Sequence, residues 1–590
     1  MPTLAEQNST AYHDRLLDAE PEQGYQIRLL ELDSGRSCPT YTIDDFTISG
    51  RLLTCAWPAI PDYVALSYSW GEQTELESIH LASHGTFQIS KDLHYCLRNL
   101  RHPDRKRHCW IDAICINQSD LQERSSQVKL MKRIYENASD VLIWLGMPPP
   151  CAGDLTGAIV GDLNHEVVKH MTNRESRSWW RRRWVVQEAA VAKHEPVVLL
   201  GNLYLPWQPL IRHCMDFNMR LKRDDADMAV VDEIRAFEGI HYIRAALRQE
   251  TVGSGLVNLL ESTKNLHASD PRDAIYAIIG LVDATAQEML VPDYTAPIID
   301  IYGIATQLLI ESRSWQREYP LDILLGWQRL LLPDASWIID FSRRPTQQNP
   351  SWFSLAGNAA LGRGQPWENS AHAPLDWGSD TSNQLSCDTD SIGANLPFHA
   401  GLTVCAGHTI VDPGDHSGLE ASFAVRPRTM SASVLTLGAI HSFVHVADYL
   451  TSTHPSAKSC DLNQLRIQQR LQCSTTELAT LLSFFNDQES PPPCSLNELC
   501  IFITDEGDLG MCYHKLNLAA LGEAPSKLEL LPGDLVAGVY GAGVPFIVRE
   551  SNWSVTSYSC LLQACMLMRE CECATRYPHR PEAFERLVFV

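Results

Sequence analysis

One glutamate in an otherwise apolar stripe is the first residue of this chain that could do chemistry. The segment Arg181–Ala192 (RRRWVVQEAAVA) predicts a helix. Helical spacing places on one face Trp180, Trp184, Glu188 and Val191. A carboxylate on such a face needs a cation, a hydrogen-bond donor or a proton, because an unpaired buried charge is costly. Glu188 is therefore the residue of this segment whose charge has to be accounted for.

Two interpretations of Glu188 stay open at this level. In the structural one, it forms an ion pair at the edge of the domain with Arg181, Arg182 or Arg183. In the functional one, the same arginines supply its counter-charge or hold a pyrophosphate. The elements around the segment bear on the choice.

Short apolar runs alternate with helical patterns around this segment. Strands are predicted for Tyr25–Leu32, Tyr63–Tyr68, Cys109–Ile116, Val141–Leu145 and Val197–Leu200. Helices are predicted for Leu93–Leu100 and Asp120–Ala138, the second opened by a capping box of Ser119 and Gln122. This alternation predicts a doubly wound α/β domain with a mainly parallel sheet.

A chain of 590 residues should form about three or four domains. The composition changes along the chain and indicates where these domains begin and end. Residues 1–24 are expected to form a polar leader, and residues 25–215 the α/β domain. Helical periods dominate residues 216–342. Residues 343–398 are rich in Ser, Asn, Asp, Gly and Pro, which predicts a loop or linker. Short alternating segments predict a β-rich C-terminal region over residues 399–590.

The charge of the chain excludes one class of partner. Lys and Arg number 48 against 71 Asp and Glu, a formal net charge of −23. Such a molecule repels phosphate backbones and anionic lipid, so we expect no nucleic-acid partner.

Neither a signal peptide nor a membrane span is expected. The N-terminus is polar and acidic, and no window reaches the ~18–20 apolar residues of a transmembrane helix. The run that begins at Val434 comes nearest, but His441, His445 and Asp448 interrupt it. The 18 cysteines are scattered, many within apolar runs, as is usual for reduced thiols. These features predict a cytoplasmic protein without stable membrane insertion.

Other chemical motifs are absent from the sequence. It contains no phosphate-binding G-x-x-x-x-G-K-S/T loop and no G-x-S-x-G elbow. Cysteines 560, 565, 571 and 573 lack the paired C-x-x-C spacing of a zinc site. We expect neither a metal site nor a resident cofactor.

Three blocks together resemble the fungal heterokaryon incompatibility (HET) domain. They are YVALSYSWG (Tyr63–Gly71), the long block Cys109–Gly146 that begins CWIDAICINQ, and RRRWVVQEAAVA (Arg181–Ala192). Segments usual in large proteins of this family follow at Ser269–Val282, Val291–Tyr294 and Pro532–Ser551. The last fifty or so residues fit the family pattern less well, while the HET blocks are intact.

This resemblance implies a fold and an activity. HET domains look like distant relatives of Toll/interleukin-1 receptor (TIR) domains, which have a flavodoxin-like α/β fold. RWVVQE falls where enzymatic TIR domains carry Trp-x-x-x-Glu, so the resemblance implies that Glu188 is the catalytic residue of NAD cleavage, with Trp184 one turn before it. NAD would then be a substrate, not a cofactor.

The resemblance and the expected strand ends together suggest the residues around the substrate. Ligands of open α/β sheets bind at the carboxyl ends of strands, where Tyr68–Gly71 and Cys115–Gln118 are expected to lie. The candidate binding residues are Tyr68, Trp70, Gly71, Asp112, Asn117, Arg183 and Trp184. Trp70 or Tyr68 could stack on nicotinamide. An aromatic residue at helical spacing usually packs in the core, which favours that interpretation of Trp184. Asp112 could equally be an acceptor that orders Asn117 and Gln118.

Two functions from different classes follow from the resemblance. The first is self/non-self recognition between fusing hyphae, in which the activated HET domain triggers cell death, by NAD hydrolysis upon self-association. The second is a non-enzymatic interaction or regulatory module recruited to another pathway, such as a secondary-metabolite gene cluster. Both involve protein partners or self-association through the HET domain.

Overall fold

The chain divides into two compact units, residues 1–297 and residues 298–590, each described here by itself. A computed structural model describes residues 4–9, 12, 15–16, 25–35, 48–70, 75–82, 84–147, 177–201, 203–212, 228–249, 255–263, 266–311, 338–343, 402–406, 427–449, 464–476, 478–479, 499–513, 530–539, 546–550, 557–567 and 585–589. Most of the expected linker, from residue 344 to residue 398, lies outside this set. The finer domain boundaries expected from composition remain predictions.

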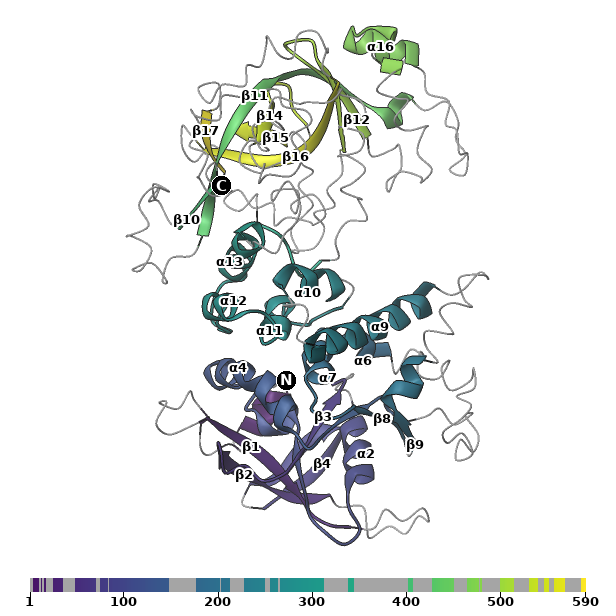
Figure 1. Ribbon diagram of the computed structural model, residues 1–590, viewed down its shortest axis with the longest axis vertical. Helices are drawn as coiled ribbons and strands as arrows, with labels where there is room; N and C mark the ends of the chain where they lie inside the picture. The colour runs from purple at the N-terminus through teal and green to yellow at the C-terminus, as the bar shows by residue number, and fades with distance from the viewer. Residues whose placement is uncertain are drawn as a thin grey trace. The chain divides into compact units, whose positions relative to one another are not determined.

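A nine-stranded sheet forms the centre of the first unit (Figure 1). Its strands are β1 (Gln26–Leu32), β2 (Ser49–Ala56), β3 (Val64–Tyr68), β4 (Leu76–Leu81), β5 (Gly85–Ser90), β6 (Arg107–Trp110), β7 (Asp140–Trp144), β8 (Val197–Leu200) and β9 (Leu203–Pro206). They stand in the order β5-β4-β2-β1-β6-β3-β7-β8-β9.

The sheet is mixed, whereas the sequence predicted a mainly parallel one. Its parallel block is β6-β3-β7-β8, the strands that the sequence shows as apolar runs. Antiparallel pairing extends the block through β1 on one side and β9 on the other. The strands β2 and β4 escaped prediction because each has few buried residues and carries no continuous apolar run.

The helices differ from prediction at three places. The apolar run at 109–116 is only half strand, because α3 (Asp112–Cys115) begins two residues after β6. Helix α4 (Leu121–Asn137) is capped by Asp120, which accepts from the amides of Gln122 and Glu123; Ser119 is not the cap. The single helix expected at 181–192 is two short helices, α6 (Arg177–Arg181) and α7 (Val185–Ala190).

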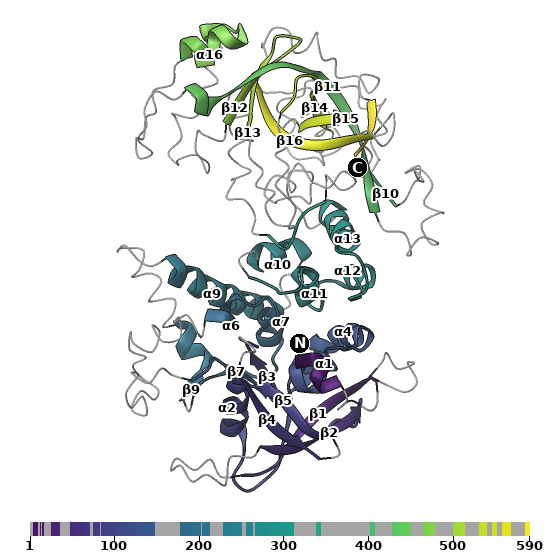
Figure 2. The same cartoon turned by 180° about the vertical axis from the view of Figure 1, so that it is seen from behind.

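Two hydrophobic clusters bury the faces of the sheet. Helix α2 (Lys91–Leu100) packs into one cluster with Leu66 of β3, and α4 packs into the other with Ala65. Neighbouring residues of one strand thus face opposite layers, as the pleat requires. Figures 1 and 2 show α2 and α4 on opposite sides of the sheet.

Helices complete the first unit, within the stretch of residues 216–342 for which the sequence predicts a helical region. It comprises α9 (Met228–Gln249), α10 (Leu256–Thr263), α11 (Asp273–Ile279) and α12 (Ala284–Met289). Helix α9 lies against both α6 and α7.

The second unit is built mainly from strands, which confirms the expected β-rich region. Helix α13 (Ile298–Glu311) precedes β10 (Leu402–Ala406), β11 (Pro427–His445), β12 (Leu499–Thr504), β13 (Leu509–Tyr513), β14 (Leu535–Val539), β15 (Phe546–Glu550), β16 (Ser557–Leu567) and β17 (Glu585–Phe589), with α16 (Gln464–Leu471) between β11 and β12. The path from β11 through β12, β13, β16, β15 and β14 returns to β11. The apolar run from Val434 belongs to β11, and no helix among the described residues is long and apolar enough to cross a membrane.

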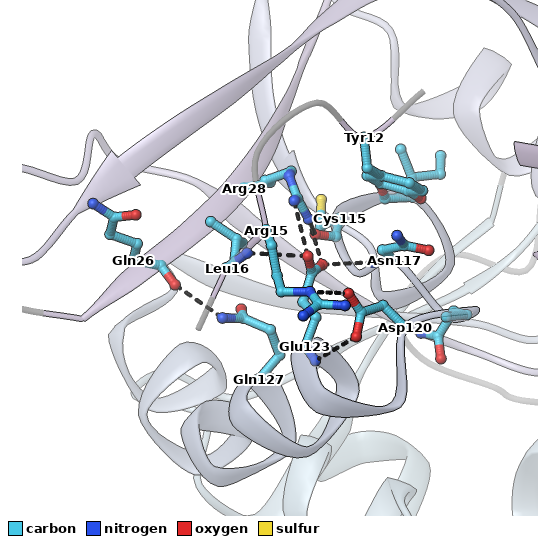
Figure 3. A network of polar contacts seen from close by, with 12 residues as sticks. Tyr12, Arg15, Leu16, Gln26, Arg28, Cys115, Asn117, Asp120, Glu123 and Gln127 are labelled. Carbon is cyan, nitrogen blue, oxygen red and sulfur yellow. Dashed lines mark hydrogen bonds and ion pairs between the residues drawn. The ribbon is translucent and has the colours of Figure 1, made fainter. Parts of the chain in front are cut away.

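A buried ion pair joins three separate segments of the first unit (Figure 3). Glu123 of α4 is fully buried, and its carboxylate accepts hydrogen bonds from both terminal nitrogens of Arg28, at 2.5 and 3.0 Å. The same carboxylate accepts the amides of Asn117 at 2.7 Å and Leu16 at 3.0 Å. It therefore connects β1, the turn before α4 and the N-terminal segment. A buried charge is tolerated only when it is satisfied in this way.

We predict that Arg28→Met lowers the free energy of unfolding by about 3–5 kcal/mol, because it leaves the Glu123 carboxylate buried without its cation. Urea unfolding of the full chain measures the change. The matched control is Arg51→Met, which removes a largely exposed arginine from Glu31 on the adjacent strand. An equal loss of stability in the two variants would show that the buried Arg28–Glu123 pair stabilises the fold no more than an exposed ion pair does.

Candidate functional site

The carboxyl ends of parallel strands bring four polar groups together in the first unit. Ser67 and Tyr68 end β3, and Asp112 follows β6. Arg182 lies in the break between α6 and α7, and Glu188 lies on α7. Strands β3 and β6 are parallel neighbours, so residues at their carboxyl ends share one edge of the sheet.

Glu188 is 1% exposed and is held by two side chains. The hydroxyl of Ser67 donates to its Oε2. Its Oε1 lies 3.8 Å from Nη2 of Arg182. The indole Nε1 of Trp179 donates to Ser67 Oγ at 2.9 Å and so fixes the serine that contacts the carboxylate. Glu188 thus has both a donor and a cation.

Arg182 is shared between two carboxylates. Besides its contact with Glu188, its Nη2 lies 4.0 Å from Oδ2 of Asp112, and its Nη1 donates to the carbonyl of Tyr68. Trp70 donates from Nε1 to the same Asp112 oxygen at 2.9 Å. Ser67, Glu188, Arg182 and Asp112 thus form a row. Within it the side chains of Arg182 and Asp112 are 21% and 14% exposed, against 2% for Glu188. The row therefore leads from a buried acid to groups that solvent can reach.

Burial dominates the ionisation of the site. It raises the pKa of Glu188 to about 7, while Arg182 lowers this pKa, Asp112 raises it and Ser67 lowers it. Burial also raises the pKa of Asp112, and Arg182 is the main group that opposes the rise. Near pH 7 Glu188 is consequently divided between its protonated and ionised forms. A carboxyl group with this pKa can exchange a proton or stabilise a positive charge at neutral pH.

Four of the predicted site residues lie together and one cannot be placed. Glu188, Asp112 and Trp70 belong to the row just described. Tyr68 contributes its backbone carbonyl, while its ring is buried in the core. Gly71 lies outside the described residues.

The other three predicted residues lie elsewhere. Asn117 caps a turn, accepting from Ser119, and donates its amide to Glu123. Trp184 packs against the hydrophobic cluster that contains α4, and while burial raises the pKa of Asp273, the Trp184 side chain lowers it. Arg183 is 2% exposed and donates to carbonyl oxygens in the helical region, those of Ala274, Thr263 and Leu266. Of the three candidate arginines, Arg182 is the one beside Glu188.

Three residues of the site were not singled out from the sequence. Ser67 is a polar residue inside the apolar run YVALSY, and that position was its only signal. Trp179 precedes the segment that the sequence predicts as a helix. Arg182 has the same local pattern as its neighbours, because a continuous helix cannot show which arginine turns toward the sheet. The break in the helix decides this, and it follows from tertiary pairing of residues 181–183 with His267.

The described residues hold no group of three or more His, Cys, Asp or Glu side chains placed to bind a metal ion. The chemistry of the site therefore has to be argued from its two carboxylates, its guanidinium and its serine hydroxyl. These groups can hold a cation or accept hydrogen bonds from hydroxyl groups, and the guanidinium can bind a phosphate.

Comparison with known proteins gives a family match over this site. Residues 63–188 match the model of the family described as heterokaryon incompatibility protein (HET). The match spans Ser67, Asp112, Arg182 and Glu188. The chain therefore carries a HET domain. No solved structure matches the chain.

A curated relative is similar over a longer stretch. Heterokaryon incompatibility protein 6, OR allele, from Neurospora crassa is 25% identical over 422 residues, which is 57% of this chain and 61% of the relative. The chain thus aligns with about three fifths of the length of that relative.

We predict that Glu188→Gln stabilises the protein at high pH, because glutamine imitates the protonated acid. The folded-state pKa of about 7 exceeds the ordinary glutamate value of 4.5, so the folded state binds more protons and wild-type stability falls as pH rises between these values. The stability of the variant relative to wild type should grow by roughly 2–3 kcal/mol between pH 5 and pH 8. Urea unfolding at both pH values measures it.

The same exchange at Glu136, an exposed residue of α4, controls for the loss of one negative charge. A Glu188→Gln difference that stays constant with pH, or that declines toward pH 8, would contradict the raised pKa.

Proposed function

We propose that this HET-domain chain acts in heterokaryon incompatibility, as the name of its relative indicates for that protein, and triggers cell death on recognition of non-self. The proposed chemistry is hydrolysis of NAD to nicotinamide and ADP-ribose by the activated HET domain, with Glu188 as the catalytic carboxylate. The observation that carries the proposal is a buried glutamate with a pKa of about 7 at the carboxyl edge of a parallel block, beside a guanidinium.

The order of the parallel strands supports a TIR-like fold for the domain. The parallel strands follow one another across the sheet as β6-β3-β7-β8. If they are numbered 1 to 4 along the chain from β3 to β8, this order is 2-1-3-4. This is the beginning of the flavodoxin-like order 2-1-3-4-5, in which ligands bind at the carboxyl ends of the strands where the order reverses. The reversal falls at β3, which supplies Ser67 and Tyr68.

The reaction needs few groups. The bond between ribose C1′ and the nicotinamide nitrogen breaks, and its electron pair returns to the pyridinium, which leaves as a neutral base. Water then adds to C1′ and releases a proton. No general acid is required, and an ionised carboxylate can stabilise the oxocarbenium-like ribose and accept its hydroxyl groups. Glu188 suits this role in its ionised form, and Asp112 is a second acceptor.

The closed geometry around Glu188 supports an enzyme that is inactive until triggered. With 1% exposure and Arg182 beside it, the carboxylate cannot contact a dinucleotide as it stands. Movement of Arg182 toward a pyrophosphate would uncover Glu188 and bind the substrate with the same guanidinium. Self-association of HET domains is the event proposed to bring this about.

The same closure favours a second candidate function. A glutamate that is salt-bridged and shielded from solvent also fits a non-enzymatic interaction module, recruited to a regulatory role in another pathway. NAD turnover separates the two functions.

We predict that the purified full chain at high concentration releases nicotinamide from NAD, and that Glu188→Gln reduces the rate at least about 100-fold by removing the charge that the transition state needs. Glu136→Gln should retain the wild-type rate. Absence of release from folded, self-associated wild type would reject the hydrolase and favour the interaction module.

We further predict that the rate rises with pH through about 7, since only ionised Glu188 is active and its pKa is about 7. Asp112→Asn should move the midpoint to lower pH, because the charge of Asp112 raises the pKa of Glu188. Rate profiles from pH 5 to 9 measure both midpoints. An unchanged midpoint in Asp112→Asn would show that the two carboxylates do not interact.

A further inference from the structure

The helix that carries Glu188 is too short to be stable alone. Helix α7 has 6 residues, Val185–Ala190, while isolated helices become appreciably populated only at about 12–15 residues. The last four carbonyls of any helix also lack partners within the helix. Whatever binds these carbonyls therefore determines whether Glu188 is held in place.

Arg244 of α9 binds the end of α7. Its Nη1 donates to the carbonyls of Ala189 and Ala190, both at 3.1 Å, and to that of Ala192 at 2.8 Å. Its Nη2 donates to the carbonyl of His194 at 2.6 Å. The side chain is buried, and a cation at this end of a helix is also favoured by the helix dipole.

The surroundings of Arg244 leave it positively charged. Burial and, to a smaller extent, the neighbouring Arg248 lower its pKa to about 10, while Glu195 opposes the shift. Arg248 itself is exposed and reaches only beyond the helix, to the carbonyls of Lys193 at 2.8 Å and Ala192 at 3.4 Å. Arg244 is thus the arginine of α9 that contacts α7, and Arg248 offers a matched control on the next turn.

The start of α7 is also held by the helical region. The backbone amide of Arg183 donates to the carbonyl of His267 at 2.9 Å, and the Arg183 guanidinium donates to the carbonyls of Thr263 and Ala274. Both ends of the short helix are therefore fixed by residues that follow it by fifty or more positions. Figure 2 shows α7 against the end of α9.

We propose that Arg244 is a positioning residue for Glu188: α9 holds the short α7 helix through it, and the site is complete only while α9 is docked. The effect on catalysis rests on the proposed NAD hydrolysis, whereas the effect on α7 does not. Arg244 donates to backbone carbonyls at the end of α7 and just beyond it, so it acts on Glu188 through the helix.

The test compares wild type, Arg244→Gln, Arg244→Lys and Arg248→Gln in the full chain. Amide hydrogen exchange over residues 185–191 should be at least about tenfold faster in Arg244→Gln, since each lost charged hydrogen bond to a buried carbonyl opens the helix end. Arg244→Lys should be intermediate, because an ammonium cannot span several carbonyls as a guanidinium does. Arg248→Gln should stay within about twofold of wild type.

Nicotinamide release provides the second readout. Arg244→Gln should lower kcat at least about tenfold and leave KM nearly unchanged, since the variant misplaces Glu188 without removing a substrate contact. If wild type releases no nicotinamide, the hydrolase proposal fails, while hydrogen exchange still decides the positioning role.

Exchange over residues 185–191 that is the same in Arg244→Gln as in wild type would overturn the proposal. Circular dichroism establishes that the variant folds. If it does not, Arg244→Lys decides: exchange faster than in wild type supports the positioning role, and wild-type exchange overturns it.

Discussion

Burial of the Glu188 carboxylate is the constraint on which the architecture of the first unit depends. Taking this group out of water costs free energy that the Ser67 hydroxyl and Arg182 offset only in part, as its raised pKa shows. The compensation requires the end of β3, the break between α6 and α7, and α7 itself to meet at one place. The helical region that anchors α7 is accordingly part of the same compact unit as the sheet.

Arginines bound to backbone carbonyls recur wherever segments distant in sequence meet. Arg182 donates to the carbonyl at the end of β3, and Arg183 donates to three carbonyls of the helical region. Arg244 donates to two carbonyls at the end of α7 and to two just beyond it. A guanidinium has five donors in a rigid plane, so it can satisfy several carbonyls that irregular backbone leaves unpaired. In these contacts the guanidinium binds backbone carbonyls and not a carboxylate. One arginine can therefore join several segments in a chain that has 48 basic residues against 71 acidic ones.

The sequence predicts the parts of this fold that a local pattern encodes. Strands such as β7 and β8 are apolar runs buried on both faces, so composition alone reveals them. Strand β4, by contrast, is mostly exposed, and only its pairing with β2 and β5 makes it a strand. In the site, the sequence identifies Glu188 as a candidate residue, but it does not distinguish the role of Arg182 from that of Arg183. Two adjacent arginines have the same local signal, and the turn that separates them forms by pairing with His267.

The closed strand path of the second unit has a consequence for how the chain is made. Strand β11 pairs with β10 and β12, but also with β14 and with β17, so that Met430 lies opposite Phe589. On the ribosome, β11 emerges long before these last partners. The nascent chain must therefore carry an unpaired strand edge until β17 has been synthesised, and such edges invite association with other chains. In the first unit the wait is shorter, because the central strand β3 pairs with β6 and β7 within residues 64–144.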